Sequence, residues 1–413
     1  MRQDESDECD LPEDLIWEIL LWLPGRLLLL LRTVCRAWNS FISSHEFVMH
    51  HHQRSTQPRL VYCSLESEGL DVMQCSVSSL LYNQLQPTRI EPLHIKYKSI
   101  QGSCNGLLCL CEGLPYKTLT LFNPCTRWVS LIVPFEYPNG DDRHPVFCGL
   151  GYDALRNKYK FVTCSKTSIT VGGLGSRAIV CTLDANPSWK TVDHPMFPYF
   201  TWCHSGTFVS GTLNWIAHDP SKNGEDDDPF RLLLEYFILT FQLETESFGR
   251  LRLPRNNHTH PGFFGRLRLP RNNHTLPGFY EDVPSLHVLK NFLSICFHPA
   301  YDNTAAYTIW IMKEYGVEKS WTLLLRIPFN GRIITPPPPG NWLEPLYMSE
   351  DYILLAYGEF YRGKLLVYNF RRREVVHPMI DISSDSLSIY PLSKFSYGKF
   401  FHVYHESLVS CFP

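Results

Sequence analysis

Three cysteines within eight residues are the first side chains in this sequence whose type and spacing suit a chemical role. A zinc site needs a further Cys/His pair at a short, regular spacing, and none follows Cys104, Cys109 and Cys111. Cys109 and Cys111 alternate along an apolar run, as side chains on one face of a strand do. The pattern favours buried thiols, so we predict neither a bound metal nor a cofactor.

Other polar clusters carry weaker signals of chemistry. His50–His52 suits weak metal binding, but a solvated stretch is the favoured interpretation. Glu225–Asp228 lacks the alternating spacing of a calcium loop and indicates a solvated insertion, with a calcium site as the alternative. Arg371–Arg373 indicates an exposed hairpin turn, with contact to an acidic target as the alternative. The sequence contains no P-loop, no His-Glu-x-x-His pair and no Gly-x-Ser-x-Gly elbow, so it favours no catalytic class.

Composition narrows the classes of partner. The 413 residues include 38 lysines and arginines against 41 aspartates and glutamates, so the net charge of −3 offers no basic excess for nucleic acid. Aromatic residues make up 14% and charged residues 19%, which favours strands and argues against global disorder. The acidic N-terminus lacks a signal-peptide pattern, and the apolar stretch 15–31 is interrupted by charges and a Pro-Gly break. We expect free thiols, no membrane partner, and localisation in the cytoplasm, the nucleus or both.

A helical pattern dominates the first fifty residues, and the elements that it predicts are short. Apolar residues recur at intervals of three and four over residues 11–23, which predicts one amphipathic helix ended by Pro24-Gly25. A second apolar helix is predicted over 27–31 and a third over 34–47. A unit of this size buries too little surface to enclose so many leucines. The helical trio is therefore expected to dock on a partner.

The order of these residues resembles the F-box. The match rests on the pairs Leu11-Pro12 and Leu23-Pro24 and on the segment Val34-Cys35-Arg36-x-Trp38. The resemblance implies binding to the Skp adaptor of a Skp–cullin–F-box ubiquitin ligase. The implied adaptor contacts are Leu11, Pro12, Leu15, Ile19, Leu23, Pro24, Leu28 and Val34, with Cys35 and Trp38 holding the helices together. For each leucine the alternative is a role only in the core of a helical cap.

Three residues depart from the pattern of related plant F-boxes. Leu27 and Leu30 stand where polar residues are usual, and Trp22 stands where a basic residue is usual. These changes add exposed apolar surface, which either strengthens adaptor docking or makes the free helical unit sticky.

The remaining chain consists of short apolar runs separated by Gly, Pro, Asn and Asp, which is typical of strands. A polar turn followed by an aromatic anchor recurs at Trp128, Trp189, Phe248 and Trp321, with spacings of 61, 59 and 73 residues. This period approaches the roughly 50 residues of kelch blades and predicts a kelch-like β-propeller, with an all-β sandwich as the alternative. The anchors are expected to pack between neighbouring sheets rather than to contact a ligand.

A tandem duplication lengthens the last spacing. Residues 248–263 and 264–279 are copies that differ only at His260 and Leu276, and removing one 16-residue copy reduces the spacing from 73 to 57. A blade has a fixed number of strands. We therefore expect one copy to pair in its sheet and the other to form a surface loop.

Three parts of this region resemble the F-box-associated domain that follows many plant F-boxes. They are Ser103–Leu110 with Phe122–Pro124, Gly149–Asp153 with Asn157–Lys160, and Val209–Trp215. Together with the F-box, the resemblance implies an α+β multidomain chain: an all-α F-box followed by a large all-β, kelch-like domain.

The predicted boundaries follow from these patterns. They are an F-box domain at 1–50, a linker with the first strands at 51–94, the β-domain at 95–400 with the duplication at 248–279, and a C-terminal tail at 401–413.

The two resemblances imply a non-catalytic adaptor. The F-box would hold the Skp adaptor and through it a cullin scaffold, while the β-domain would bind an unknown protein for ubiquitination. Proximity to the charged ubiquitin carrier then supplies the rate enhancement, without a nucleophile or base from this chain. One alternative is a kelch-type propeller oxidase that holds copper through Tyr and His, although no cluster marks such a ligand set. Another is an F-box protein that works outside ubiquitination.

Overall fold

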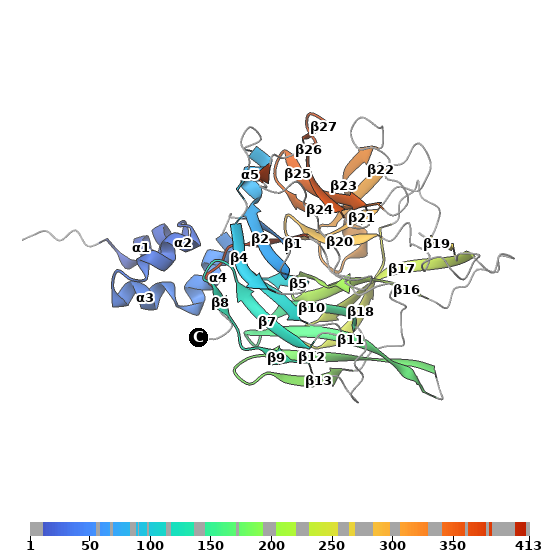
Figure 1. The fold of residues 1–413 in the computed structure, drawn as a ribbon, viewed down its shortest axis with the longest axis horizontal. Helices are drawn as coiled ribbons and strands as arrows, with labels where there is room; N and C mark the ends of the chain where they lie inside the picture. Colours follow the sequence, from blue (N-terminus) through green and yellow to red (C-terminus); the bar gives the residue numbers. More distant parts are fainter. Residues whose placement is uncertain are drawn as a thin grey trace, which may run out of the picture.

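The computed structural model contains an N-terminal helical unit beside a ring of β-sheets (Figure 1). The structure describes residues 11–54, 58–66, 69–82, 88–89, 91–96, 99–112, 117–135, 145–170, 173–192, 204–219, 231–254, 264–268, 284–297, 306–328, 341–359, 362–376, 380–381 and 401–409. Glu225–Asp228, His260 and Leu276 lie outside these residues.

The helical unit has four helices rather than the expected three. They are α1 (Glu13–Leu21), α2 (Gly25–Leu31), α3 (Arg36–Ile42) and α4 (His45–Arg54). The fourth helix corrects in part the expectation of a solvated stretch at His50–His52, because His50 is exposed but His51 is only 2% exposed. α4 buries Phe47, Val48 and His51 on one face, which an isolated polar tract would not do. The F-box unit therefore extends to residue 54. No described helix has the length and apolar character needed to cross a bilayer.

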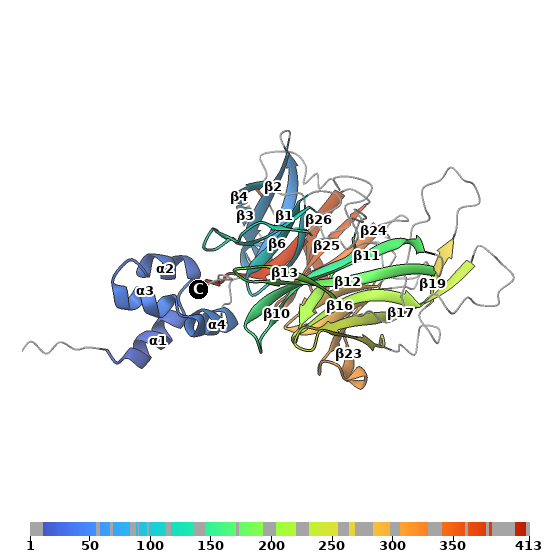
Figure 2. The same cartoon turned by 90° about the horizontal axis from the view of Figure 1, so that it is seen from below.

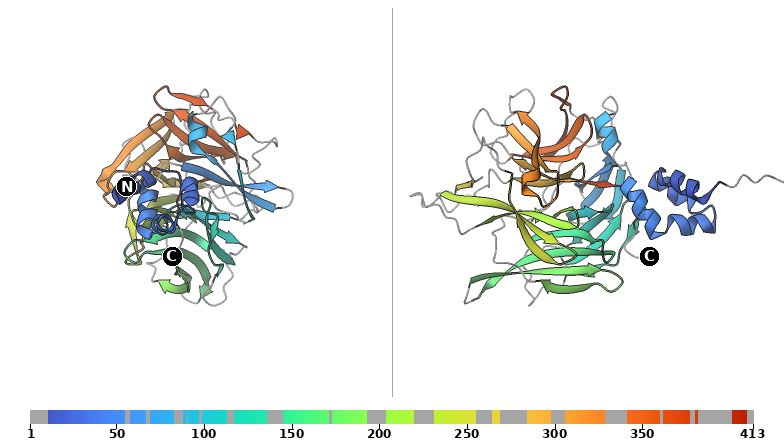
Figure 3. Two further views of the ribbon diagram at one scale, coloured as in Figure 1. Left: turned by 90° about the vertical axis from the view of Figure 1, so that its left-hand side faces the viewer. Right: turned by 180° about the vertical axis from the view of Figure 1, so that it is seen from behind.

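The described strands form six sheets of four or five strands each, arranged as the blades of a propeller (Figures 1 and 3). This confirms the predicted propeller over the sandwich. Blade 1 contains β29 (Phe401–His405), β1 (Pro58–Glu66), β2 (Gly69–Ser76) and β4 (Glu91–Lys96). Blade 2 contains β5 (Ser99–Cys104), β6 (Leu107–Glu112), β7 (Thr118–Asn123) and β8 (Trp128–Val129), with β9 (Val133–Pro134) also on β7. Blade 3 contains β10 (Pro145–Asp153), β11 (Lys158–Thr170), β12 (Gly173–Leu183) and β13 (Ser188–Val192), with β14 (His204–Ser205) parallel to β10.

The second half of the ring repeats the same four-strand unit. Blade 4 contains β15 (Thr207–Val209), β16 (Thr212–Asp219), β17 (Arg231–Gln242) and β18 (Ser247–Leu251), with β19 (Phe264–Arg268) also on β17. Blade 5 contains β20 (Ser285–Leu289), β21 (Phe292–Phe297), β22 (Ala306–Met312) and β23 (Trp321–Pro328). Blade 6 contains β24 (Asn341–Met348), β25 (Tyr352–Glu359), β26 (Arg362–Asn369) and β27 (Glu374–Val376). The helix α5 (Val77–Tyr82), the 3₁₀ turn Glu318–Ser320 and the short pair β3 (Thr88–Arg89) and β28 (Ile380–Asp381) complete the described elements.

The two ends of the chain close the ring. β29 runs antiparallel to β1, with Pro58 opposite His405 and Tyr62 opposite Phe401. The propeller therefore begins at β1 and not at residue 95, and the described part of the expected tail 401–413 contains a blade strand. Blade 1 is completed only when the last residues of the chain are present.

Tight hairpin turns join the inner strands of the blades. Asn105 and Gly106, between β5 and β6, have φ angles of +50° and +81°, and two successive left-handed residues of this kind match the twist of the strands that they join. Gly106 is also required for space, since a Cβ there would lie 2.3 Å from the Ser407 hydroxyl oxygen.

Both copies of the duplicated segment pair with β17, which corrects the expectation that one would be a surface loop. Residues of the first copy form most of β18, opposite Ile238–Gln242, and the second copy begins with β19, opposite Arg231–Glu235. The two strands do not compete, because β17 is 12 residues long and holds them end to end on one edge.

The aromatic anchors lie on the outer strands β8, β13, β18 and β23 and are all half-buried. The Trp189 indole nitrogen donates to the Pro134 carbonyl at 3.0 Å, and that of Trp321 donates to the Arg252 carbonyl at 3.2 Å. Each indole thus contacts the end of the preceding blade. Phe248 packs on Phe241 at 4.7 Å between ring centroids.

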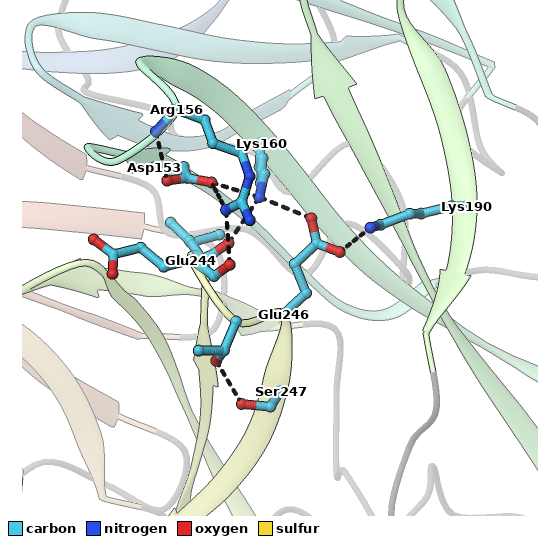
Figure 4. A network of polar contacts seen from close by, with 9 residues as sticks. Asp153, Arg156, Lys160, Lys190, Glu244, Glu246 and Ser247 are labelled. Atoms are coloured by element: carbon cyan, nitrogen blue, oxygen red, sulfur yellow. Dashed lines mark hydrogen bonds and ion pairs between the residues drawn. The ribbon is translucent and has the colours of Figure 1, made fainter.

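A buried lysine joins blades 3 and 4 (Figure 4). Lys160 on β11 is 2% exposed, and its Nζ lies 2.7 Å from the carboxylates of Asp153 and Glu246 and 2.8 Å from the Leu243 carbonyl oxygen. These three acceptors match the three donors of an ammonium group. Burial alone would raise the pKa of Asp153, but hydrogen bonds from Lys160 and Arg156 outweigh it and hold that pKa below its usual value.

Candidate adaptor-binding surface

An apolar stripe runs along the outer face of α1. Leu15 is 51% exposed and Ile19 53%, and their spacing of four residues places them on one side of the helix. Leu11, which is 57% exposed, lies just before the helix, ahead of its N-cap Pro12. The opposite face is buried, with Leu20 and Leu21 in the core. The three exposed residues are among the predicted adaptor contacts, and the described part of the chain leaves them exposed.

The inner face of α1 is fixed by aromatic packing. The Trp17 ring lies edge-on to Phe41 of α3 at 4.7 Å and to Phe47 of α4 at 5.1 Å between centroids. Such packing sets the rotation of α1 about its axis, so the Leu15 and Ile19 side chains are held outward.

The structure separates the remaining predicted contacts into two groups. Pro12, Pro24 and Val34 are exposed, Val34 by 62%, and Leu23 is half-buried. Leu28 is fully buried and belongs to the hydrophobic core, which favours the alternative of a core role, and its contact with the adaptor stays a prediction. The same leucine pattern fits both interpretations.

Cys35 and Trp38 occupy the start of α3. Trp38 is half-buried against the core, whereas Cys35 is exposed. The Cys35 sulfur accepts a hydrogen bond from the Trp38 backbone nitrogen at 3.4 Å. Cys35 therefore acts as the N-cap of α3 rather than as a core residue between helices.

The F-box unit shares one hydrophobic core with blades 2 and 3 and projects from one end of the propeller, with α4 nearest the strands (Figures 2 and 3). At Gly25, the first residue of α2, a Cβ would lie 2.8 Å from the Cys125 sulfur and 3.7 Å from a Leu408 methyl group. Only a glycine allows this approach without a shift. The F-box is thereby seated on the turn after β7 and on the C-terminal segment.

One buried histidine of α4, His51, and one half-buried histidine, His52, lie at this junction. The His51 Nε2 lies 2.9 Å from the Leu23 carbonyl oxygen, and burial lowers the pKa of this residue. Burial, reinforced by the neighbouring His405 and His51, lowers the pKa of His52 to about 4. Both rings are therefore neutral at pH 7, and the junction carries no charge from them. This burial could not be predicted from the sequence, because a run of three histidines is polar and shows no apolar periodicity.

A charged pair flanks the apolar stripe. Arg54 at the end of α4 binds the Glu18 carboxylate through two nitrogens, at 2.6 and 3.4 Å. These hydrogen bonds hold the pKa of Glu18 below its usual value. The Arg54 guanidinium carbon also lies 5.8 Å from the centroid of the Trp22 ring, and Trp22 is 72% exposed. Trp22 is the added apolar surface predicted from the sequence, but its contact with Arg54 of α4 could not be predicted there.

The other candidate groups for chemistry form no reactive site in the described residues. Cys104, Cys109 and Cys111 are buried free thiols, as predicted. Across the described ranges, no three His, Cys, Asp or Glu side chains lie close enough to hold a metal ion. Arg371 and Arg372 are exposed in the turn before β27 and pair with Asp351 and Glu374.

Comparison with known proteins defines the class of the chain. Residues 9–50 match the F-box domain, and residues 63–411 match the F-box associated beta propeller domain. The second match covers most of the chain, so this protein belongs to the F-box proteins with an F-box associated β-propeller.

Its similar relatives are plant F-box proteins. The F-box/kelch-repeat protein At3g23880 of Arabidopsis thaliana is 25% identical over 385 residues, covering 90% of each chain. The F-box protein At3g07870 of the same plant is 28% identical over 338 residues, covering 75% of this chain and 71% of its own. Among solved structures, Kuenenia stuttgartiensis hydrazine synthase aligns with 81% of this chain and 47% of its own at 8% identity and a TM-score of 0.42, which is too distant to add to the assignment.

Proposed function

We propose that this chain is a non-catalytic substrate-recognition subunit of a Skp–cullin–F-box ubiquitin ligase. The F-box would bind the Skp adaptor, and the propeller would bind the protein to be ubiquitinated. The observation that carries the proposal is the exposed apolar stripe of Leu15 and Ile19 on a helix whose other face is buried, with the exposed Leu11 just before that helix. Exposed apolar surface of this kind marks an interaction site.

The joint between the two domains supports the same proposal. A Cβ at Gly25 would lie 2.8 Å from the Cys125 sulfur, so the two segments are closely packed, and the F-box and blades 2 and 3 share one core. A rigid joint would hold a bound target at one position relative to the ligase, which raises its effective concentration at the ubiquitin carrier. The free thiols of the described cysteines suit a reducing compartment, so we place this function in the cytoplasm, the nucleus or both.

Adaptor binding is tested in the full-length chain with the substitutions Leu15→Asp and Ile19→Asp together. Both side chains are half-exposed, so the variant should fold, while two charges in an apolar interface should abolish capture of a purified plant Skp adaptor. The matched control is Leu155→Asp, which places a charge at a residue that is 72% exposed in a blade 3 turn. Adaptor capture equal to that of the unmodified chain would refute the proposal.

Target binding is tested by affinity purification of the same variants from plant cells. The Leu15→Asp/Ile19→Asp variant should lose the adaptor and cullin but keep the proteins held by the propeller. Those proteins should carry ubiquitin when they are purified with the unmodified protein, but not when they are purified with the Leu15→Asp/Ile19→Asp variant. If every co-purifying protein is lost together with the adaptor, the propeller is not the target-binding domain.

A further inference from the structure

Trp22 extends the apolar stripe of α1 beyond the residues that the F-box resemblance implies. It follows Ile19 by three residues and Leu15 by seven, which are the intervals of one helix face. Its backbone remains in the right-handed helical region, with φ −89° and ψ −10°, so the helical direction of the side chain is kept. At 72% exposure, Trp22 is more exposed than either of the two other residues.

The Trp22 side chain is supported from one side by a charged pair. The Arg54 guanidinium carbon lies 5.8 Å from the centroid of the indole, within the range of a cation–π contact. Arg54 is itself held by two hydrogen bonds to Glu18, which lies one helical turn before Trp22. An exposed tryptophan fixed in this way loses little conformational freedom on binding.

The surroundings of Trp22 have the composition of a protein interface. Leu11, Leu15 and Ile19 provide an apolar centre, and Glu18 and Arg54 provide a polar rim at its edge. Tryptophan is the residue type most often found at the energetic centre of such interfaces. The surface stays open when the F-box is seated on the propeller, so the chain does not cover it with its own residues in the described ranges.

We infer that Trp22 is an anchor residue for the Skp adaptor, inserted into an apolar pocket of that protein next to the contacts of Leu15 and Ile19. The occupant follows from continuity, because Trp22 lies on the same helix face as the stripe assigned to the adaptor. This inference rests on the proposed function and deepens it: the site would make this chain a tighter adaptor ligand than an F-box with a basic residue at this position.

The test is calorimetric titration of the full-length chain with a purified plant Skp adaptor. Trp22→Ala should raise the Kd by about tenfold or more, as expected for loss of a central tryptophan. Trp22→Phe should keep most of the affinity. Arg54→Ala should raise the Kd by about threefold, because the indole loses its support but not its contacts. The matched control is Leu155→Ala, a residue of equal exposure outside the F-box, which should leave the Kd unchanged.

The outcomes separate this inference from the proposed function. A Kd within twofold for Trp22→Ala, with binding lost in Leu15→Asp/Ile19→Asp, would overturn the role of Trp22 and leave the adaptor assignment intact. Unchanged binding in both variants would overturn both. Light scattering tests whether the Trp22 surface binds a second copy of the chain instead. If the unmodified chain self-associates and Trp22→Ala makes it monomeric without changing the adaptor Kd, the surface binds a second copy and the inference is wrong.

Discussion

The side chain of Asn123 in blade 2 binds the C-terminal segment that closes the propeller. Its Nδ2 donates to the Ser407 carbonyl oxygen at 3.0 Å and to the Val409 carbonyl oxygen at 2.7 Å. Its Oδ1 accepts from the backbone nitrogens of Cys125 at 2.8 Å and Thr126 at 3.3 Å. A single buried amide therefore joins the turn beneath the F-box to the segment that follows the last strand, β29.

Asn123→Leu should strongly destabilise the protein. The substitution keeps the side-chain volume but leaves buried backbone donors and acceptors without partners, each of which costs about 1–3 kcal/mol. We therefore expect the free energy of unfolding to fall by roughly 3 kcal/mol. Urea unfolding measures this decrease. Asn186→Ala, at an exposed turn of blade 3, is the control and should change stability by no more than about 0.5 kcal/mol. Equal stability of the two variants would contradict the role of Asn123 in closure.

Lys160→Met should remove the joint between blades 3 and 4. It leaves the Asp153 and Glu246 carboxylates without their shared cation, and breaking a buried ion pair in this way costs about 3–5 kcal/mol. Lys190→Met is the control, because Lys190 also pairs with Glu246 but is 57% exposed, and its loss should cost less than about 1 kcal/mol.

The pH dependence of the Lys160→Met difference provides a second measurement. The pKa values of Asp153 and Glu246 are lowered in the folded chain, so their contribution is present above the ordinary carboxyl pKa and is lost as the pH falls through the lowered values. The stability gap between the two chains should therefore narrow below about pH 4. A gap that stays constant from pH 7 to pH 3 would show that these carboxylates do not contribute.

The two leucines Leu15 and Leu28 show how far sequence could predict the candidate site. Both fit the same apolar periodicity, yet Leu15 is half-exposed and Leu28 is fully buried. The helix period shows which residues share a face, but not which residues pack on that face. The face of α2 that contains Leu28 packs in the core that the F-box shares with the propeller. The contact between Arg54 and Trp22 could not be predicted from the sequence either, because these residues lie 32 positions apart on different helices.

In the propeller, too, the local features could be predicted from the sequence, whereas the pairing between distant segments could not. The strands and outer anchors repeat a local pattern of turn and aromatic residue, so they could be predicted from short windows. The closing strand could not, because Phe401 pairs with Tyr62 across 339 residues. No periodicity in residues 401–413 distinguishes an inner strand from a tail, and only the missing edge of blade 1 selects its partner.

The contact between Gly25 and Cys125 predicts a non-additive pair of substitutions. Gly25→Ala would place a Cβ 2.8 Å from the Cys125 sulfur, so it should cost about 1–2 kcal/mol even though alanine favours helices. Cys125→Ala alone should cost about 1 kcal/mol through lost packing. In the double variant the new Cβ has room, so its loss should be smaller than the sum by about 1 kcal/mol. Urea unfolding of all four chains measures this coupling. If the losses in the free energy of unfolding are additive, the structure accommodates the new Cβ of Gly25→Ala without strain against Cys125.

The last prediction concerns the duplicated segment on β17. β16 pairs with β17 only as far as Glu235, so in the described residues the backbone of 231–234 is paired by β19 alone.

Deleting 248–263 or 264–279 gives two chains that differ at a single residue, since the copies differ only at His260 and Leu276. The remaining copy should form β18 in both, because Ser247 already pairs with Gln242 beside a short turn. We expect both chains to fold with nearly equal melting temperatures. Hydrogen exchange should lose protection by about tenfold or more at residues 231–234 and keep it at 238–242, since an unpaired strand end opens locally. Retained protection at 231–234 would mean that β19 does not pair there, and that the second copy is the surface loop first expected.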